Sequence, residues 1–227
     1  MSTPDAYGDG LSRLQKVTWV VARAIVVAVA KVWFRYELHH PERLPTSGAF
    51  VLAPVHRSNL DTPILPVIRK APIRFMGKAS LWEVNKAADW LLTMLGGFPV
   101  SRGAADRGAL RAAEEILERG ETLVMFPEGT RRSGDLVLEE NMFDGPSFVA
   151  GRQQCPVVPV GIAGSEDAMP IGKKMVYPRK IVFVIGEPMD PPAQNEKGRV
   201  SRNEVKRHTE SLRQEMQKLY DEAKSLR

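Results

Sequence analysis

Two side chains that could act together in acid–base catalysis, His56 and Asp61, lie five positions apart. They follow a short apolar segment, residues 49–53, that predicts a buried strand. A histidine titrates near neutral pH, so it can take a proton from a hydroxyl group. An aspartate at this distance can fold back onto one ring nitrogen, which leaves the other nitrogen to face a substrate. The same pair is also typical of a structural histidine near a helix start, with Asp61 or Thr62 as the capping residue.

Charged side chains follow three other predicted strands. Lys78 and Arg102 each come after a short apolar segment, and a polar loop of residues 127–132 comes after residues 122–126, the clearest buried strand. Arginine and lysine side chains on separate loops can hold a phosphate group from two sides, although each alone is also typical of a solvated surface. Glu128 could accept hydrogen bonds from substrate hydroxyls or pair with an arginine, and both alternatives stay open.

Several other kinds of chemistry lack the residues they need. No Gly-x-Ser-x-Gly sequence and no glycine-rich phosphate-binding loop occurs, which argues against covalent serine catalysis and nucleotide binding. The chain has 1 cysteine, Cys155, and 4 histidines without zinc-site spacing, so we expect neither a disulfide nor a metal site. The net charge of +5 favours anionic partners. Only 7% of the residues are aromatic, and since nucleic-acid binders interleave aromatic and basic residues, we expect no nucleic-acid partner.

The predicted elements alternate between strands and helices, which is typical of an α/β fold with a mainly parallel sheet. From the length of 227 residues we expect a single domain at residues 37–227, in which helices flank the central sheet. Loops after the carboxyl ends of parallel strands gather at one edge, so the candidate groups should meet there. The strands are expected at residues 50–53, 73–76, 98–100, 122–126, 156–162 and 180–185, and the helices at residues 64–69, 80–95, 106–119, 146–152 and from residue 201.

The N-terminal segment divides into a polar leader, residues 1–10, which we expect to be disordered, and an amphipathic helix over residues 11–36. On a helical wheel the cations fall within one arc, the valines and isoleucines fall opposite, and Trp19 and Trp33 lie at the edge of the apolar arc. The longest apolar run, Ala24–Ala30, is far shorter than the ~20 residues of a spanning helix. The helix could pack on the protein's own core, or it could lie in a membrane surface with its cations among anionic head groups.

Four short blocks resemble, in order and approximate spacing, the motifs of the glycerolipid acyltransferases, the family of the 1-acylglycerol-3-phosphate acyltransferases. The first is His-Arg-Ser-Asn-Leu-Asp at residues 56–61, which has the family's His-x4-Asp pattern. The third, Phe-Pro-Glu-Gly-Thr-Arg at residues 126–131, matches in full. Residues 97–102 and 157–162 look like the second and fourth blocks, so the resemblance covers roughly residues 50–185.

The resemblance implies an O-acyltransferase that moves a fatty acyl group from an acyl thioester to the free hydroxyl of 1-acylglycerol-3-phosphate (lysophosphatidic acid) in phospholipid biosynthesis. His56 would deprotonate that hydroxyl and Asp61 would orient the imidazole. The donor would be acyl-CoA or an acyl carrier protein, and neither a metal nor a further cofactor is implied. The residues implied in substrate binding are Lys78, Arg102, Glu128, Gly129, Thr130 and Arg131.

This substrate class favours the membrane-surface interpretation of residues 11–36, because the acyl chains of substrate and product belong in lipid. We therefore expect a peripheral, monotopic protein on the cytoplasmic face of an anionic membrane. Two positions depart from the family pattern: Val55 stands where many members have asparagine, and Asp144 stands where a lysine is common. Other acceptors, namely glycerol-3-phosphate, a lysophospholipid or a glycolipid, therefore stay open, as do a thioesterase or hydrolase that uses water and a non-catalytic membrane-binding protein.

Overall fold

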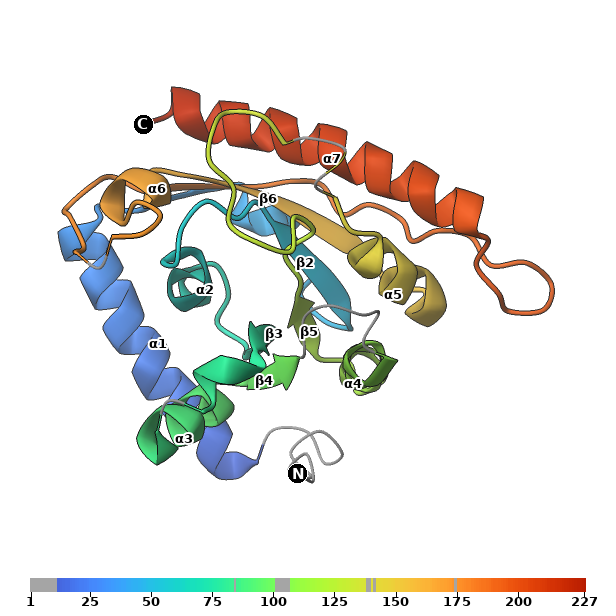
Figure 1. Ribbon diagram of the computed structural model, residues 1–227, viewed down its shortest axis with the longest axis horizontal. Helices are drawn as coiled ribbons and strands as arrows, with labels where there is room; N and C mark the ends of the chain where they lie inside the picture. The colour runs from blue at the N-terminus through green and yellow to red at the C-terminus, as the bar shows by residue number, and fades with distance from the viewer. Residues whose placement is uncertain (1–11, 84, 101–106, 138–139, 141, 174) are drawn as a thin grey trace.

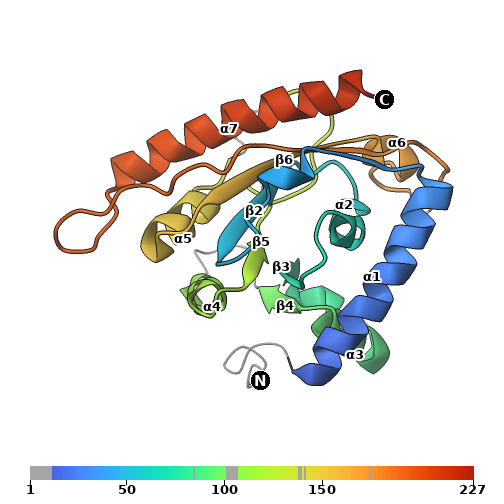
Figure 2. The ribbon, with the colours of Figure 1, turned by 180° about the vertical axis from the view of Figure 1, so that it is seen from behind.

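A seven-stranded sheet forms the centre of the molecule, and helices lie on both of its faces (Figures 1 and 2). The structure is a computed structural model that describes residues 12–227, apart from residues 84, 101–106, 138–139, 141 and 174. The predicted disordered leader, residues 1–10, lies outside the described residues. In spatial order the strands are β1 (Glu37–His39), β7 (Val182–Ile185), β6 (Val157–Ala163), β2 (Phe50–Pro54), β5 (Thr122–Val124), β3 (Ile73–Lys78) and β4 (Gly97–Val100).

Neighbouring strands run parallel throughout this sheet except for the antiparallel pair β6 and β7. In the centre, Leu52 of β2 pairs with Val124 of β5 on one side and with Val158 of β6 on the other. The carboxyl ends of β2, β5, β3, β4 and β6 therefore reach the same edge. The predicted fold class, an α/β domain with a mainly parallel sheet flanked by helices, is confirmed.

The central strands are apolar along their whole length because both faces of the sheet are covered. Every residue of β2, β5, β6 and β7 is buried, which is the pattern expected of a sheet between two helical layers. Gly161 of β6 lies against the backbone of Leu219, where a Cβ atom would overlap with the carbonyl group. The missing side chain therefore lets the C-terminal helix approach β6 closely.

Two groups of helices cover the sheet. One face carries α4 (Arg107–Glu118), α5 (Gly145–Gln153) and the long α7 (Arg202–Ser225), and the other carries α1 (Arg13–Trp33), α2 (Asp61–Ile64) and α3 (Lys86–Met94) (Figures 1 and 2). The short α6 (Ser165–Ala168) follows β6. Ser201 caps α7 at the predicted position, where its Oγ accepts the backbone N–H of Glu204 at 3.1 Å. These layers place the loops after β2, β5 and β6 at one end of the sheet.

Three short segments differ from the sequence predictions. β1 lies where the sequence indicated no strand, and it forms because its three residues pair with β7. The helix expected over residues 64–69 is a 3-10 turn, Leu65–Val67, after α2, because Pro66 has no N–H to continue an α-helix. The helix expected over residues 80–95 begins only at Lys86, and the preceding turn folds back so that Trp82 Nε1 donates to Thr93 Oγ1 at 3.2 Å.

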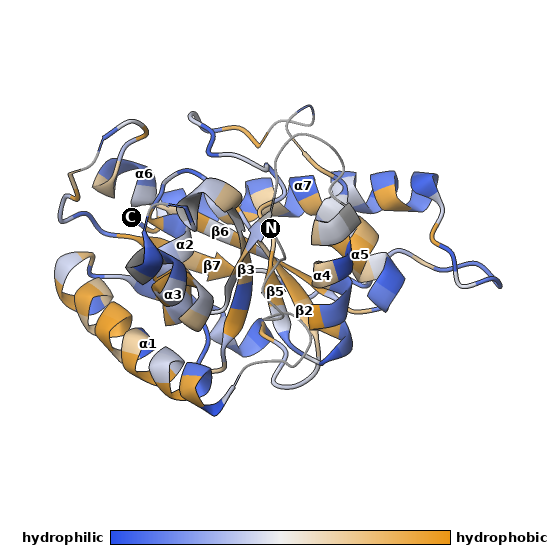
Figure 3. Ribbon diagram, turned by 60° about the horizontal axis from the view of Figure 1, so that its bottom comes forward, coloured by the Kyte–Doolittle hydropathy of each residue, from blue (hydrophilic) through white to orange (hydrophobic). Residues whose placement is uncertain are grey.

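The N-terminal helix α1 packs on the domain through a mixed face and turns its more apolar face outward (Figure 3). Trp19 is 3% exposed and donates its ring N–H to the carbonyl of Lys70 at 3.1 Å. Arg23 Nε donates to the carbonyl of Arg69 at 2.8 Å. The exposed apolar residues of the helix are Leu14, Val17, Val20, Val21, Ile25, Val29, Val32 and Trp33.

This orientation corrects two sequence-based expectations about α1. Trp19 does not lie at an exposed edge, and Arg23 does not point outward, because both bond to carbonyl groups at residues 69 and 70. The helix does pack on the domain, partly through Val26 and Val27, but most of its valines and Ile25 remain exposed. None of the helices in the described part of the chain combines the length and the apolar character needed to cross a bilayer.

Candidate active site

The loop after β2 is organised around the carboxylate of Asp61. Its Oδ2 accepts a hydrogen bond from His56 Nδ1 at 2.9 Å. The same oxygen accepts the backbone N–H groups of Arg57 and Ser58, both at 2.7 Å. Asp61 therefore closes this loop and does not cap α2, which has no side-chain cap. Residues 56–61 are called the catalytic loop below.

The imidazole of His56 is held in one orientation with one nitrogen left available. Because a carboxylate oxygen only accepts, Nδ1 carries the hydrogen in the contact with Asp61, and Nε2 is left as an acceptor. The ring stacks on Phe126 with 4.1 Å between the ring centroids and 27° between the planes. The His56 side chain is 13% exposed, and Nε2 has no hydrogen bond within the described residues. A proton on an entering hydroxyl group can therefore pass to Nε2.

A buried ion pair lies beside the catalytic loop. The Arg57 side chain is 1% exposed, and its Nη1 lies 2.6 Å from Glu128 Oε2. Its Nη2 donates to the carbonyl of Leu136 at 3.3 Å, and the guanidinium carbon lies 4.9 Å from the ring centre of Tyr220 on α7. Burial raises the pKa of Glu128, and the positive charge of Arg57 opposes that rise. The pair joins the catalytic loop, the loop after β5 and α7.

The structure thus selects one of the two contacts considered for Glu128. Its carboxylate pairs with Arg57, a partner that no pattern in the sequence indicates, and its side chain is 1% exposed. Its second oxygen, Oε1, is buried and has no hydrogen-bond partner within the described residues.

Backbone contacts hold the loop after β5 next to the catalytic loop. The N–H of Gly129 donates to the carbonyl of Phe126 at 3.0 Å, and the N–H of Thr130 donates to that of Glu128 at 2.7 Å. Gly129 has a φ of +63°, which an L side chain rarely adopts, and a Cβ there would overlap with the ring of Phe143. The N–H of Arg132 donates to the carbonyl of His56 at 2.9 Å. The two loops therefore form one unit at the sheet edge.

The cations predicted to bind a phosphate group are described only in part. Lys78 is the last residue of β3 and pairs in register with Val100 at the end of β4. Arg102 lies outside the described residues. Arg131 follows Thr130 in the loop after β5, is partly exposed, and has no side-chain hydrogen bond or ion pair among the described residues. The backbone thus brings the ends of β3 and β4 and the loop of Arg131 to the same edge as His56.

Comparison with known proteins gives one family. The family model described as Acyltransferase matches residues 35–163. A 1-acyl-sn-glycerol-3-phosphate acyltransferase of Bacillus subtilis is 30% identical over 154 residues, which are 67% of this chain and 73% of that protein. The chain belongs to the glycerolipid acyltransferase family. A crystal structure of the 1-acyl-sn-glycerophosphate acyltransferase of Thermotoga maritima superposes with a TM-score of 0.72 and 26% identity, and covers 93% of this chain and 80% of that one.

A relative named for a different lipid acceptor is also similar. A lyso-ornithine lipid O-acyltransferase of Pseudomonas aeruginosa is 32% identical over 120 residues, which are 51% of this chain and 43% of that protein. The family model includes both the catalytic loop and the loop after β5. The protein is therefore an acyltransferase enzyme, as the four sequence blocks implied.

Sequence reasoning missed two residues of this acyltransferase site, Arg57 and Tyr220. Tyr220 lies four positions after Met216, the spacing that places two residues on one face of a helix, so its burial had a signal in the sequence. Arg57 lies inside the first block, where an arginine after a histidine is typical of a solvated loop. Its burial depends on Glu128, which lies 71 positions later in the chain, and no local pattern indicates that pairing.

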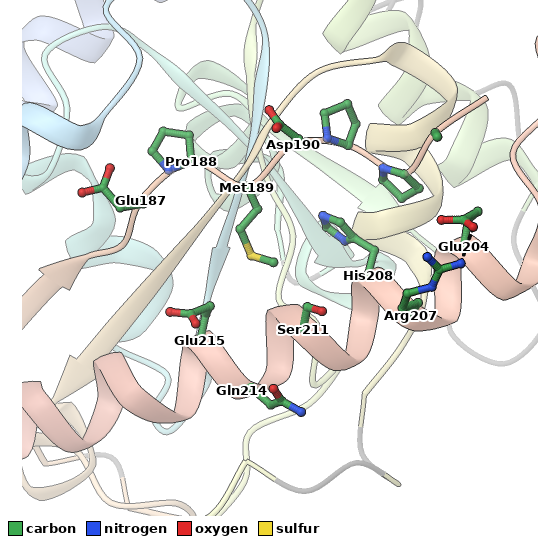
Figure 4. Close-up of a pocket in the computed structure, with 13 residues that line it drawn as sticks. Glu187, Pro188, Met189, Asp190, Glu204, Arg207, His208, Ser211, Gln214 and Glu215 are labelled. Atoms are coloured by element: carbon green, nitrogen blue, oxygen red, sulfur yellow. Dashed lines mark hydrogen bonds and ion pairs between the residues drawn. The ribbon is translucent and has the colours of Figure 1, made fainter.

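A cavity of about 810 Å³ lies between residues 187–193 and α7 (Figure 4). His208 lines it and contacts Ser147 Oγ through Nδ1 at 2.9 Å. Its lining includes no residue of the catalytic loop or of residues 127–132, so it is separate from the candidate active site. Within the described residues, no three His, Cys, Asp or Glu side chains are arranged to hold a metal ion.

Proposed function

We propose that this acyltransferase transfers a fatty acyl group from an acyl thioester to the free hydroxyl of 1-acylglycerol-3-phosphate. The observation that carries the proposal is the His56–Asp61 pair at 2.9 Å with Nε2 unengaged among the described residues. The Bacillus relative is named for this acceptor, and so is the Thermotoga structure. The donor is acyl-CoA or an acyl carrier protein.

His56 acts as the general base and then as the general acid. Nε2 takes the proton of the acceptor hydroxyl as its oxygen attacks the thioester carbonyl carbon. The tetrahedral intermediate collapses, the C–S bond breaks, and the thiolate leaves with the proton carried by His56. Asp61 keeps Nδ1 protonated and stabilises the imidazolium that forms between these steps. The products are a phosphatidic acid and a free thiol.

The acceptor phosphate binds to cations at the edge formed by β3, β4 and the loop after β5. Arg131 supplies a guanidinium group with no partner of its own in the described part of the protein. Lys78 and Arg102 are assigned to the same phosphate group because of the family resemblance and the position of β3 and β4. Gly129 and Thr130 are assigned to the acceptor site from the family resemblance, and their N–H groups hold the loop in shape. Glu128 contributes by holding Arg57, and thereby the catalytic loop, in place.

The enzyme works as a peripheral, monotopic protein on the cytoplasmic face of an anionic membrane, with α1 in the lipid surface. Support comes from Val21, Ile25 and Val32, which are 56%, 60% and 81% exposed on one side of α1. Leaving such side chains in water is unfavourable by about 1.5–3 kcal/mol each relative to burial. Lys16 and Lys31 are also exposed and would lie among anionic head groups.

Purified protein with acyl-CoA and lysophosphatidic acid tests the proposal by mass spectrometry of the lipid products. We expect phosphatidic acid to form, and we expect His56→Ala to lower kcat by about 10³ or more, because the general base is lost. Free fatty acid released at the same rate with and without acceptor would identify a thioesterase instead. Full activity in the His56→Ala variant would contradict the assigned base.

A second acceptor class has specific support and belongs in the same assay. The Pseudomonas relative is named for a lyso-ornithine lipid. Asp144 stands where a lysine is common in the family, and it precedes α5 without making a side-chain cap. Glycerol-3-phosphate, a lysophospholipid and lyso-ornithine lipid, each offered with the same acyl-CoA, decide among the acceptors. A kcat/KM for lyso-ornithine lipid above that for lysophosphatidic acid would replace the proposed acceptor.

A further inference from the structure

A cavity of about 420 Å³ adjoins the catalytic loop, and neither the four sequence blocks nor the proposed mechanism gives it a role. Its lining comes from the residue after His56, from residues 132–135, from the segment after β6 and from the last turns of α7. The cationic side chains in its wall are Arg57, Arg132, Lys224 and Arg227, and the acidic ones are Asp135, Glu166 and Asp167.

All but one of these cations have an acidic partner. Arg57 pairs with Glu128 at 2.6 Å, and Lys224 pairs with Asp135 at 2.7 Å. Arg227 pairs with Asp167 and Glu166. Arg132 has no ion pair within the described residues, and its Nε is buried without a hydrogen-bond partner there. A negatively charged ligand would complete the charge balance at this arginine.

Two ion pairs at the rim of the cavity can rearrange so that their cations bind such a ligand. Asp135 and Asp167 have side chains that are 75% and 53% exposed, so their pairs with Lys224 and Arg227 are weak and can rearrange. Burial raises the pKa of Glu166, and Arg227 opposes that rise. The two exposed aspartates can therefore move away from their cationic partners when an anion enters.

The cavity extends to the β6 side of the catalytic loop, and part of its wall is formed by residues 132–135, which directly follow Arg131 in the loop after β5. In the sheet, β6 borders β2 on one side, whereas β5, β3 and β4 follow on the other. The cavity is lined by residues after β6, while Lys78 and Arg102 belong to β3 and to the segment after β4. The backbone N–H of Arg132 bonds directly to the carbonyl of His56, so its side chain starts beside the catalytic base.

We propose that this cavity binds a phosphate group of the acyl donor, with Arg132 as its principal ligand. The acceptor phosphate is assigned to Lys78, Arg102 and Arg131, and a reaction between two substrates at His56 leaves the part of the edge next to β6 for the donor. Coenzyme A and acyl carrier proteins both carry a phosphopantetheine phosphate next to the thioester arm. A planar guanidinium with free N–H donors suits such an oxyanion. This inference rests on the proposed acyl transfer.

A series of donors with and without phosphate tests the proposal. Steady-state kinetics would compare one acyl group on coenzyme A, on an acyl carrier protein, on phosphopantetheine and on pantetheine, which lacks phosphate. For Arg132→Ala we expect the KM for the phosphorylated donors to rise about tenfold or more, with the KM for acyl-pantetheine changed less than about twofold. Arg132→Lys keeps the charge without the planar fork, so its KM should lie between those of Arg132→Ala and the unchanged enzyme.

Controls separate this effect from others. Arg111→Ala removes an arginine whose side chain is 82% exposed on α4, and it should change no KM. A rise in the KM for lysophosphatidic acid instead of the donor would assign Arg132 to the acceptor and overturn the inference. An equal rise for acyl-CoA and acyl-pantetheine would overturn it as well. If the unchanged enzyme transfers no acyl group, the proposed function fails first, which is a separate result.

Discussion

The catalytic loop and α1 are unusual in opposite ways. The loop buries charged side chains, whereas α1 exposes large apolar side chains. In the catalytic loop, Arg57 and Asp61 are charged residues that are 1% and 0% exposed. On α1, Val32 and Ile25 are large apolar residues that are 81% and 60% exposed. Folded proteins rarely bury charges without partners or gather exposed apolar side chains on one face.

The difference between the two regions lies in where their partners are. The buried charges of the loop have partners inside the protein, since Asp61 accepts three hydrogen bonds and Arg57 pairs with Glu128. The exposed side chains of α1 have no cover in the described part of the chain. The charges of the first region are therefore paired within the protein, whereas the apolar side chains of the second would be covered only by an external apolar phase, which we propose is lipid.

The largest effect is expected from changing the hydrogen-bond character of Asp61. Asp61→Asn replaces an acceptor-only carboxylate with an amide that can donate to Nδ1 and favour the wrong tautomer of His56. We expect kcat to fall by about 10³–10⁴ while the far-UV circular dichroism stays unchanged. Ser58→Ala keeps the backbone N–H that bonds to Asp61, so its kcat should fall less than tenfold. Equal losses in both variants would contradict a special role for the Asp61 carboxylate.

The next effect concerns the stability of the buried ion pair. Arg57→Met or Glu128→Leu alone leaves one charge buried without its partner, and we expect each to lower the free energy of unfolding by about 3–5 kcal/mol. The double variant removes both charges and should recover most of this loss, as measured by urea unfolding. The exposed pair Arg111–Glu115 is a matched control, whose removal should cost less than about 0.5 kcal/mol. Additive losses in the double variant would show that the two side chains act independently.

A smaller effect is expected on α1, and it should appear in membrane binding but not in folding. Val21→Asp with Ile25→Asp removes two exposed apolar groups, and we expect partitioning into anionic vesicles to fall about a hundredfold. The free energy of unfolding should change by less than about 0.5 kcal/mol, because both residues are exposed. Met175→Asp, at an exposed position outside α1, controls for added charge. Unchanged vesicle binding with reduced stability would show that this face packs within the protein.

The smallest effect comes from Cys155, a buried group that ionises without an opposite charge beside it. Burial raises the pKa of its thiol to about 11 from the ordinary 9.0. Between these values the folded protein keeps a proton that the unfolded chain loses, so stability falls as pH rises through this window. We expect Cys155 to contribute about 2 kcal/mol to the loss in urea unfolding between pH 9 and 11, and Cys155→Ala should remove this contribution. An unchanged slope in that variant would assign the loss to other groups.

Much of this architecture is legible in local patterns. The apolar runs at residues 122–126 and 156–162 indicated central strands because a strand covered on both faces has no polar side. His56 and Asp61 lie in one short loop, so their contact needs only a local turn. The helices predicted at residues 64–69 and 80–95 were less accurate. In the first segment a proline prevents an α-helix, and in the second a turn stabilised by Trp82 replaces the first part of the predicted helix.

By itself the sequence determined the α/β class, the family and the placement of His56 and Asp61 in one short loop, because these depend on side-chain types and short spacings. Only the tertiary structure decided which partner Glu128 takes and which face α1 turns outward. The contact between Arg57 and Glu128 spans 71 positions, and the bonds from Trp19 and Arg23 reach carbonyl groups that lie 51 and 46 positions away. Such contacts have no local signal, because folding alone brings the two ends together.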